Sequence, residues 1–208
     1  MFCQSAERAL DSLQMVYGDS LVILSYHTQD DDSFRTVDSK ERGRFYNYGV
    51  EPSSVFDGGS PYFIEGNYYT LYQDQILGAR SQATSLTMEF DTAKTKIDSN
   101  QINIGLNVTP TESLPDRANL RLFVVVYEKI ANYLSAFPPH DTLHSLFVVR
   151  KIVPDTLGLN LTVDFPNSFD TTFTTEAENF DETQIGVASF VQNIQTKEVL
   201  QSVVKRNF

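Results

Sequence analysis

The chain has no tryptophan and only one cysteine, Cys3, among its 208 residues. A single cysteine excludes an intrachain disulfide and a thiolate-based zinc cluster in the chain as given. No run of about 18 apolar residues is present, so we expect no membrane-spanning helix. The polar stretch "CQSAERALDS" occupies the place where a signal peptide needs an apolar core, so we expect no signal segment in this chain.

Positive charge is also scarce. The chain carries 16 Lys and Arg against 27 Asp and Glu, with a net charge of −11 and a pI near 4.6. Because nucleic-acid binding needs a basic surface that displaces counterions, we expect no nucleic-acid partner. An anionic membrane surface is disfavoured on the same ground. The G-x-S-x-G, H-E-x-x-H and phosphate-loop patterns are missing too, so nothing in the sequence indicates a hydrolase or a nucleotide-dependent enzyme.

Residues from about Thr84 onward follow a β pattern. Ile102, Ile104, Leu106 and Val108 alternate with polar residues, as in a strand with one buried face. The other predicted strands are 85–91, 119–128, 143–152, 169–177, 184–193 and 198–206. About seven strands in about 120 residues favour an immunoglobulin-like β-sandwich over residues 84–208.

The first 82 residues mix helical and strand patterns. Ala6, Leu10, Leu13 and Tyr17 recur at helical spacing and predict an opening helix that ends at Gly18. The further predicted elements are a buried strand at 20–27, a helix at 39–48 closed by Gly49, two strands within 53–66 joined at Gly58–Gly59, and a helix capped by Asn67. We therefore expect a separate α/β domain over residues 1–82.

Polar residues near the opening helix suggest one candidate site. Cys3 falls in the first helical turn, where the helix dipole and unpaired backbone N–H groups favour a thiolate. His27, at the end of the strand 20–27, either modulates that thiol or, as is commoner, satisfies its ring nitrogens at the strand terminus. Asp30, Asp31 and Asp32 lack the ligand spacing of a calcium loop, so we interpret them as a solvated loop.

Two further candidates lie in the second half. His140 and His144 have the spacing of a helical metal pair, but Pro138–Pro139 precedes both and a strand follows. That spacing does not bring two side chains together on a strand, so we expect no metal site there. Arg150, on the same strand, is interpreted as a structural partner of an acidic neighbour.

Two segments of the first half carry a family resemblance. "CQSAERALDSLQMVYGDSLVILSYHTQDDDSF" and "RFYNYGVEPSSVFDGG" resemble the thioredoxin-like domain of exported bacterial proteins of the outer-membrane-protein-28-related family. "LHSLFVVRKIV" is more loosely similar to a His-and-Arg strand in the β-sandwich that follows this domain in the family. The resemblance implies a thioredoxin-like domain plus a sandwich, in a protein of the bacterial cell envelope that is periplasmic or associated with the outer membrane.

The resemblance also implies roles for individual residues. Cys3 aligns with the second, resolving cysteine of a C-x-x-C motif, whose first cysteine would lie before Met1. Pro52 aligns with a cis-proline opposite that motif, and Val50 and Glu51 would flank the groove that holds a substrate peptide. Either the chain is truncated before the first cysteine, or Met1 begins a degenerate, redox-inactive relative.

Two functions follow from the resemblance. The first is thiol-disulfide exchange on partner proteins, in which the missing cysteine attacks and Cys3 resolves, with no metal or organic cofactor. The second is a non-catalytic envelope protein that uses the thioredoxin-like half as a scaffold and the sandwich to recognise a protein partner. With one cysteine, the chain as given cannot cycle a dithiol by itself.

Overall fold

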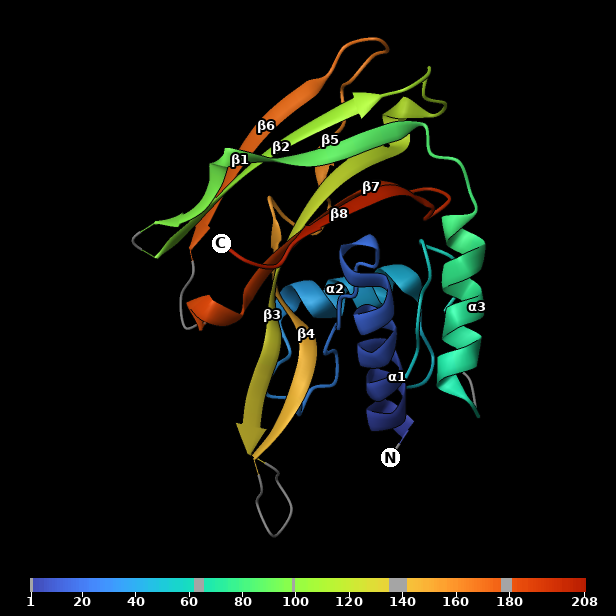
Figure 1. Cartoon of the computed structure of the whole chain (residues 1–208), viewed down its shortest axis with the longest axis vertical. Coiled ribbons are helices and arrows are strands. Elements are labelled where there is room, and N and C mark those ends of the chain that lie inside the picture. Colours follow the sequence, from blue (N-terminus) through green and yellow to red (C-terminus); the bar gives the residue numbers. More distant parts are fainter. Residues whose placement is uncertain (1, 62–65, 99, 135–141, 177–180) are drawn as a thin grey trace.

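The computed structural model describes residues 2–61, 66–98, 100–134, 142–176 and 181–208. These residues form three layers (Figure 1). A three-stranded sheet packs on one face of a five-stranded sheet, the first two helices with the segment 21–27 cover the other face, and the third helix packs on the first. Helices precede antiparallel sheets, and the C-terminal part is mostly β, which agrees with the predicted fold class at this level.

The three helices begin and end close to the predicted positions. They are α1 (Phe2–Tyr17), α2 (Val37–Tyr46) and α3 (Tyr68–Arg80), and short 3-10 turns occur at Gly18–Ser20, Arg117–Asn119 and Glu182–Gln184. Asn67 caps α3 as predicted, because its side chain accepts a hydrogen bond from Thr70 N at 3.4 Å. Thr36 caps α2 in the same way. Asn47, with a φ of 53°, ends α2 before the predicted Gly49 is reached.

All seven strands predicted from residue 84 onward are present, and one short strand adds to them. The three-stranded sheet has the order β1 (Leu86–Asp98), β2 (Gln101–Pro110), β6 (Phe169–Glu176). The five-stranded sheet has the order β4 (Thr142–Val153), β3 (Leu120–Leu134), β7 (Ile185–Asn193), β8 (Val199–Lys205), and β5 (Leu159–Asn160) pairs with β3. Every pairing within the two sheets is antiparallel.

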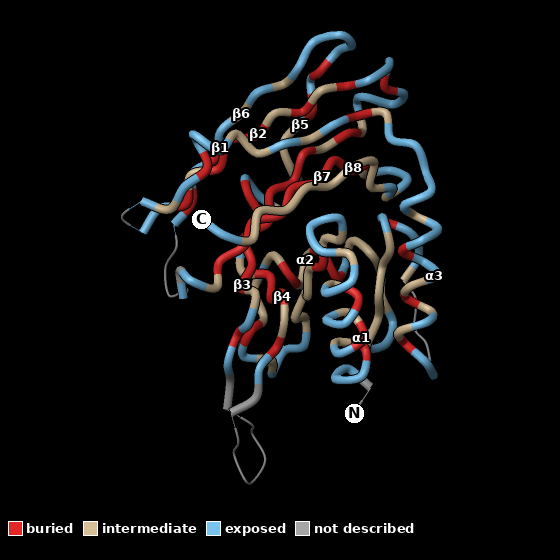
Figure 2. The backbone as a smooth tube through the Cα atoms, viewed as in Figure 1, coloured by how far each residue is buried: buried red, intermediate tan, exposed pale blue. Residues whose placement is uncertain are grey.

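The five-stranded sheet is buried on both faces. On β3, Leu122 and Val124 point into the core shared with the three-stranded sheet, whereas Phe123 and Val125 point toward the helices. Every residue of β7 is buried, which gives the continuous red tube in Figure 2. A strand buried on both faces has apolar residues at consecutive positions rather than at alternate ones. The helical layer is therefore part of the same packed structure as the sheets.

The segment 20–27 differs from its prediction. It is extended, but within it the structure has only one isolated bridge, a parallel pairing of Ser25 with Val148 of β4. Ile23, Leu24 and Tyr26 pack on the helix-facing side of the five-stranded sheet. Its apolar side chains are thus buried by this packing rather than in a central sheet of their own. Among residues 2–61 and 66–80 the structure contains no regular strand, and of the predicted strand pair in 53–66, residues 62–65 lie outside the described residues.

Arg42 joins α2 to the sheet. Its guanidinium is buried, donates from Nη2 to Gln192 Oε1 at 2.9 Å, and stacks over the rings of Phe123 and Phe190. Aromatic faces attract a cation, and this attraction is stronger where water is excluded. Tyr26 lies in the same layer, where burial raises the pKa of its hydroxyl to about 12.

A smaller core joins α1 to α3. Leu13 and Ala9 of α1 pack against Tyr72 and Ile76 of α3, and all four side chains are buried. Leu13 belongs to the stripe that the sequence predicts for the opening helix, whereas Ala9 lies outside that stripe and is buried all the same. The contact fixes the direction of α1, so it also fixes where the first turn of that helix lies.

We expect Leu13→Ala to lower the free energy of unfolding by about 2 to 5 kcal/mol, because truncating a fully buried leucine leaves a cavity. Met15→Ala is the matched control on the same helix, since Met15 is 83% exposed, and it should change that free energy by less than about 0.5 kcal/mol. Equilibrium unfolding in urea measures both. Equal effects would contradict the packing of α1 on α3.

Candidate functional site

Cys3 is an exposed free thiol at the start of α1. Its pKa is raised, first because the surrounding protein removes part of the water from the thiol and then because the carboxylates of Glu51 and, less strongly, Glu7 oppose a second negative charge. The residue as a whole stays exposed, so the desolvation is partial. The sequence-based expectation of a thiolate is therefore wrong for this chain, since burial and acidic neighbours outweigh the helix dipole.

The loop after α2 brings Glu51 to the thiol. Thr28 Oγ1 donates a hydrogen bond to Glu51 Oε1 at 2.9 Å, and the Tyr48 hydroxyl forms a short hydrogen bond with the same Thr28 oxygen. The Glu51–Pro52 peptide bond is cis, and the Val50 side chain is half exposed. The structure thus places Glu51 within electrostatic reach of Cys3. A role for Val50, Glu51 and Pro52 in holding a peptide stays a prediction.

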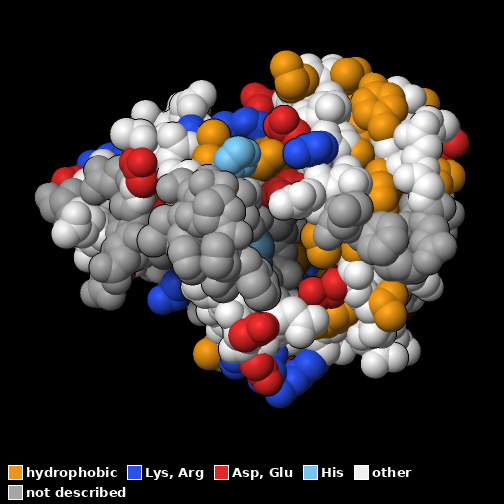
Figure 3. All heavy atoms as spheres, turned by 90° about the horizontal axis from the view of Figure 1, so that it is seen from below, with side chains coloured by type: hydrophobic (Ala, Val, Ile, Leu, Met, Phe, Trp, Pro, Cys, Tyr) orange, Lys and Arg blue, Asp and Glu red, His pale blue; other side chains and the backbone are white. Residues whose placement is uncertain are grey.

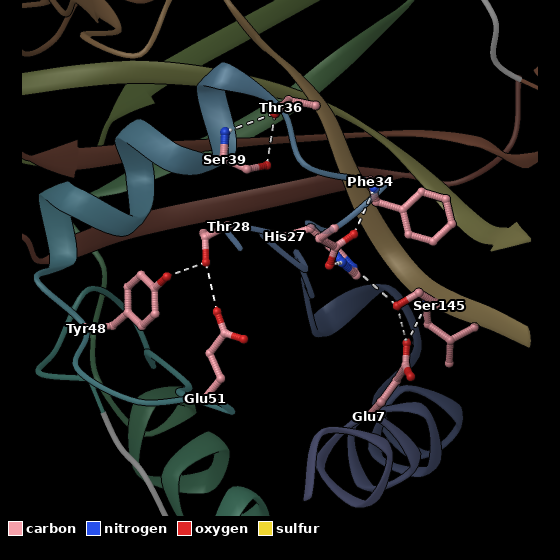
Figure 4. Close-up of polar contacts among 11 residues, drawn as sticks. Glu7, His27, Thr28, Phe34, Thr36, Ser39, Tyr48, Glu51 and Ser145 are labelled. Carbon is pink, nitrogen blue, oxygen red and sulfur yellow. Dashed lines mark hydrogen bonds and ion pairs between the residues drawn. The ribbon is translucent and has the colours of Figure 1, made fainter. Parts of the chain in front are cut away.

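A second polar network links three elements next to this loop (Figure 4). His27 Nδ1 lies 2.6 Å from Asp32 Oδ2, and His27 Nε2 lies 3.2 Å from Ser145 Oγ on β4. Ser145 Oγ donates its one proton to Glu7 Oε1 on α1 at 2.9 Å, and the same carboxylate oxygen accepts the Leu146 backbone N–H at 2.5 Å. We call Glu7, His27, Asp32, Ser145 and Leu146 the α1–β4 clamp.

The clamp contains the atoms of a serine-histidine-aspartate relay, but its surroundings do not suit a nucleophile. Ser145 is only 9% exposed, and the Glu7 carboxylate beside its oxygen opposes the negative charge that an attack would create. Ser145 lines neither the cleft beside α2 nor the cleft between α1 and α3. The clamp therefore ties α1 and the segment 21–27 to β4, and His27 satisfies both ring nitrogens, as the structural alternative expected.

The acidic loop and the second-half candidates have ordinary structural roles. Asp30 pairs with Lys40 and Arg35, each at 2.9 Å, so the pKa of its carboxyl is lowered, chiefly by the hydrogen bond from Lys40. Arg150 pairs with Glu128 of β3, as predicted for a structural residue. His144 is exposed on β4, and His140 lies outside the described residues.

A cleft of about 260 Å³ lies between α2 and the loop that follows it. Its walls are formed by Thr28, Lys40, Gly43, Arg44, Asn47 and Tyr48. Thr28 and Tyr48 also belong to the hydrogen-bonded group that holds Glu51, so the cleft adjoins the loop that faces Cys3. We call it the α2 cleft. No spacing pattern in the sequence predicts this cleft, because Thr28 reaches α2 only through the fold.

Figure 3 views the molecule from the end at which α1 begins. Hydrophobic side chains gather on the part of this face where α1 and α3 lie, and acidic and basic side chains are interspersed elsewhere. No helix among the described residues is long and apolar enough to cross a membrane.

Replacing Glu51 by glutamine should lower the pKa of the Cys3 thiol toward its ordinary value, because a carboxylate that opposes the thiolate is removed. Glu89→Gln, an exposed site on β1, makes the same change in net charge and should leave that pKa unaltered. The pH dependence of alkylation by iodoacetamide measures it in both variants. If the pH profile of alkylation is the same in Glu51→Gln as in the unsubstituted protein, Glu51 does not influence the Cys3 thiol.

Glu7→Ala should destabilise the fold by about 1 to 3 kcal/mol, because the Ser145 hydroxyl and the Leu146 N–H lose an acceptor in a partly buried place. Asp11→Ala, an exposed site one turn further along α1, is the control and should have little effect. Thermal unfolding of both variants checks this. A loss no larger than that of the control would show that the clamp does not hold α1.

No protein-family model and no curated protein sequence matches the chain. Among solved structures, HBP35 of Porphyromonas gingivalis aligns with a TM-score of 0.64 at 14% sequence identity over 85% of this chain. The match covers 61% of that structure, so this chain spans about three fifths of its length. A domain of the outer membrane lipoprotein Omp28 of the same organism aligns with a TM-score of 0.42 and 18% identity, over 61% of this chain and 90% of that one, which carries no argument about the fold. The chain is therefore similar in fold to HBP35, and this likeness extends to the fold alone.

Proposed function

We propose that the chain is a protein of the bacterial cell envelope that holds an extended segment of a partner protein across the start of α1 and joins it through Cys3. The observation that carries this proposal is the exposed free thiol beside the loop of Val50 and Glu51. The apolar side chains over α1 and α3 on the same face offer further contact area (Figure 3). The envelope location rests on the sequence resemblance of the first half to the outer-membrane-protein-28-related family.

The covalent step is thiol-disulfide exchange. The Cys3 thiol loses its proton to solvent, and the thiolate attacks one sulfur of a disulfide carried by the partner. A bond forms between the Cys3 sulfur and that sulfur, the partner's own disulfide bond breaks, and its second sulfur leaves as a thiolate. The partner disulfide is thus the oxidant, and its leaving sulfur is reduced. Because the pKa of Cys3 is raised, this attack is slow at neutral pH and accelerates as the pH rises.

The fold proposed for the two halves supports the same function. We propose that residues 84–208 are an immunoglobulin-like sandwich, and two antiparallel sheets of orders β1-β2-β6 and β4-β3-β7-β8 support this proposal. For residues 1–82 we propose a thioredoxin-like origin, supported by the sequence resemblance and by a thiol at the start of the first helix. A thiol before Met1, or one on the partner, would be needed to release the captured segment.

A second function is favoured by one observation. The raised pKa of Cys3 makes it a poor nucleophile at neutral pH, which suits an envelope scaffold that binds without exchange. In that case the sandwich would recognise the partner, and Cys3 would have no part.

The test is the rate at which Cys3 forms a mixed disulfide with an extended peptide that carries a disulfide, followed by mass spectrometry. Val50→Asp should slow this rate about tenfold, because a charge replaces an apolar contact in the groove. The same variant should leave the reaction with glutathione disulfide, which is too small to span the groove, unchanged.

Val37→Asp, a more exposed valine at the start of α2, is the control and should slow neither reaction. Equal slowing of both reagents in Val50→Asp, or no adduct with the peptide at any pH at which the thiol ionises, would favour the scaffold.

A further inference from the structure

The α2 cleft concentrates positive charge on a strongly acidic protein. Lys40 and Arg44 lie one turn apart on α2 and both line the cleft, although the net charge of the chain is −11. Tyr48 and Thr28 also line the cleft, although their hydroxyl groups already bond to each other and to Glu51, and Asn47 adds a side-chain amide. Ammonium, guanidinium and amide N–H groups are the donors that a carboxylate accepts from.

The two cations that line the cleft, Lys40 and Arg44, form ion pairs with exposed carboxylates. Lys40 Nζ lies 2.9 Å from Asp30 Oδ1, and the Asp30 side chain is 80% exposed. Arg44 pairs with Glu41 along the outer side of α2, and its own side chain is 63% exposed. Exposed pairs of this kind are weak, so an incoming carboxylate can compete for both cations.

The shape of the cleft depends on a glycine. A Cβ atom at Gly43 would lie 2.8 Å from Tyr48 Cε1 and 3.1 Å from Thr28 Cγ2, both of which are wall atoms. Gly43 thus lets the Tyr48 ring pack close to α2 at the base of the cleft. A side chain here would push that ring outward and change the volume of about 260 Å³.

The α2 cleft adjoins Glu51, the residue that faces the thiol. Thr28 Oγ1, in the cleft wall, donates to Glu51 Oε1, and Glu51 raises the pKa of Cys3. A path along Glu51 and Thr28 would join the thiol to the cleft, and an extended segment bound to Cys3 would follow it. The charges along this path change sign, because Glu51 and Glu7 repel an acidic residue near the sulfur whereas the cleft attracts one.

We propose that the α2 cleft binds the carboxylate of an aspartate or glutamate side chain in the partner segment, several residues away from the cysteine that joins Cys3. This inference rests on the proposed function and names its substrate class, a disulfide-bearing segment with an acidic residue at one end. The acidic side chain sets the direction of the segment, since the reverse direction would place it beside Glu51.

The experiment measures the binding of fluorescent peptides to the Cys3→Ser variant by anisotropy, so that affinity is separated from disulfide chemistry. Each peptide has a serine at the position of the cysteine and a glutamate at a chosen distance from that serine, and this distance varies across the series. The control for each peptide has glutamine in place of the glutamate. At one distance the glutamate peptide should bind about tenfold more tightly than the glutamine peptide, and added salt should reduce that preference.

Matched variants assign the preference to the cleft. The double variant Lys40→Gln, Arg44→Gln should lose the preference for the glutamate peptide. The control double variant Lys96→Gln, Lys151→Gln removes the same charge at two exposed lysines elsewhere and should keep that preference. Gly43→Ala should weaken the binding of the glutamate peptide, although both cations are still present. Retention of the preference in the Lys40 and Arg44 double variant would overturn the proposal.

Two further measurements are needed. The first distinguishes a peptide carboxylate from a free anion as the ligand of the cleft, and the second distinguishes failure of this inference from failure of the proposed function. Inorganic phosphate that binds the cleft tightly, without any preference for the glutamate peptide, would show a free-anion site and overturn the proposal. In the chain with Cys3 intact, mixed disulfides that form equally fast with glutamate and glutamine peptides would leave the proposed function standing and overturn the acidic subsite. Failure of all peptides to form them would instead remove the proposed function.

Discussion

The helix-facing side of the five-stranded sheet is the surface on which the rest of the structure depends. Phe123 and Val125 of β3 and Phe190 of β7 point away from the sandwich core and must be covered. The three-stranded sheet packs on the opposite face, so α2 and the segment 21–27 form the layer that buries them. The positions of α1, α2 and the segment 21–27 follow from this requirement, and Cys3, Glu51 and the α2 cleft are held by those elements.

The helices and strands whose apolar residues recur at a regular spacing could be predicted from the sequence. The strands from residue 85 onward alternate or are continuously apolar, and the opening helix repeats an apolar stripe, so their existence could be predicted from local pattern. The segment 20–27 shows the limit of this reasoning. A short apolar run such as Ile23, Leu24 and Tyr26 is buried equally well by a sheet or by packing between helices and a sheet, and periodicity does not distinguish the two.

The site was less accessible to prediction because its parts are distant in sequence. Glu7 and Ser145 are separated by 138 positions, and no spacing rule relates them. The expected thiolate at Cys3 failed for a similar reason, since the helix dipole is a local feature and the opposing Glu51 arrives from another loop. His27 was predicted correctly only as a residue that satisfies its own nitrogens, without its partners being named.

The α1–β4 clamp has a mechanical consequence for a partner attached at Cys3. Tension on such a tether would pull at the first turn of α1, and Glu7 is one turn away from the point of attachment. The bonds from Ser145 and Leu146 to Glu7 would carry that force sideways into β4 and from there into the paired strands of the sheet. The first turn of α1 would thus stay attached to β4 under tension, and the force would be distributed over the five-stranded sheet instead of acting on one helix end.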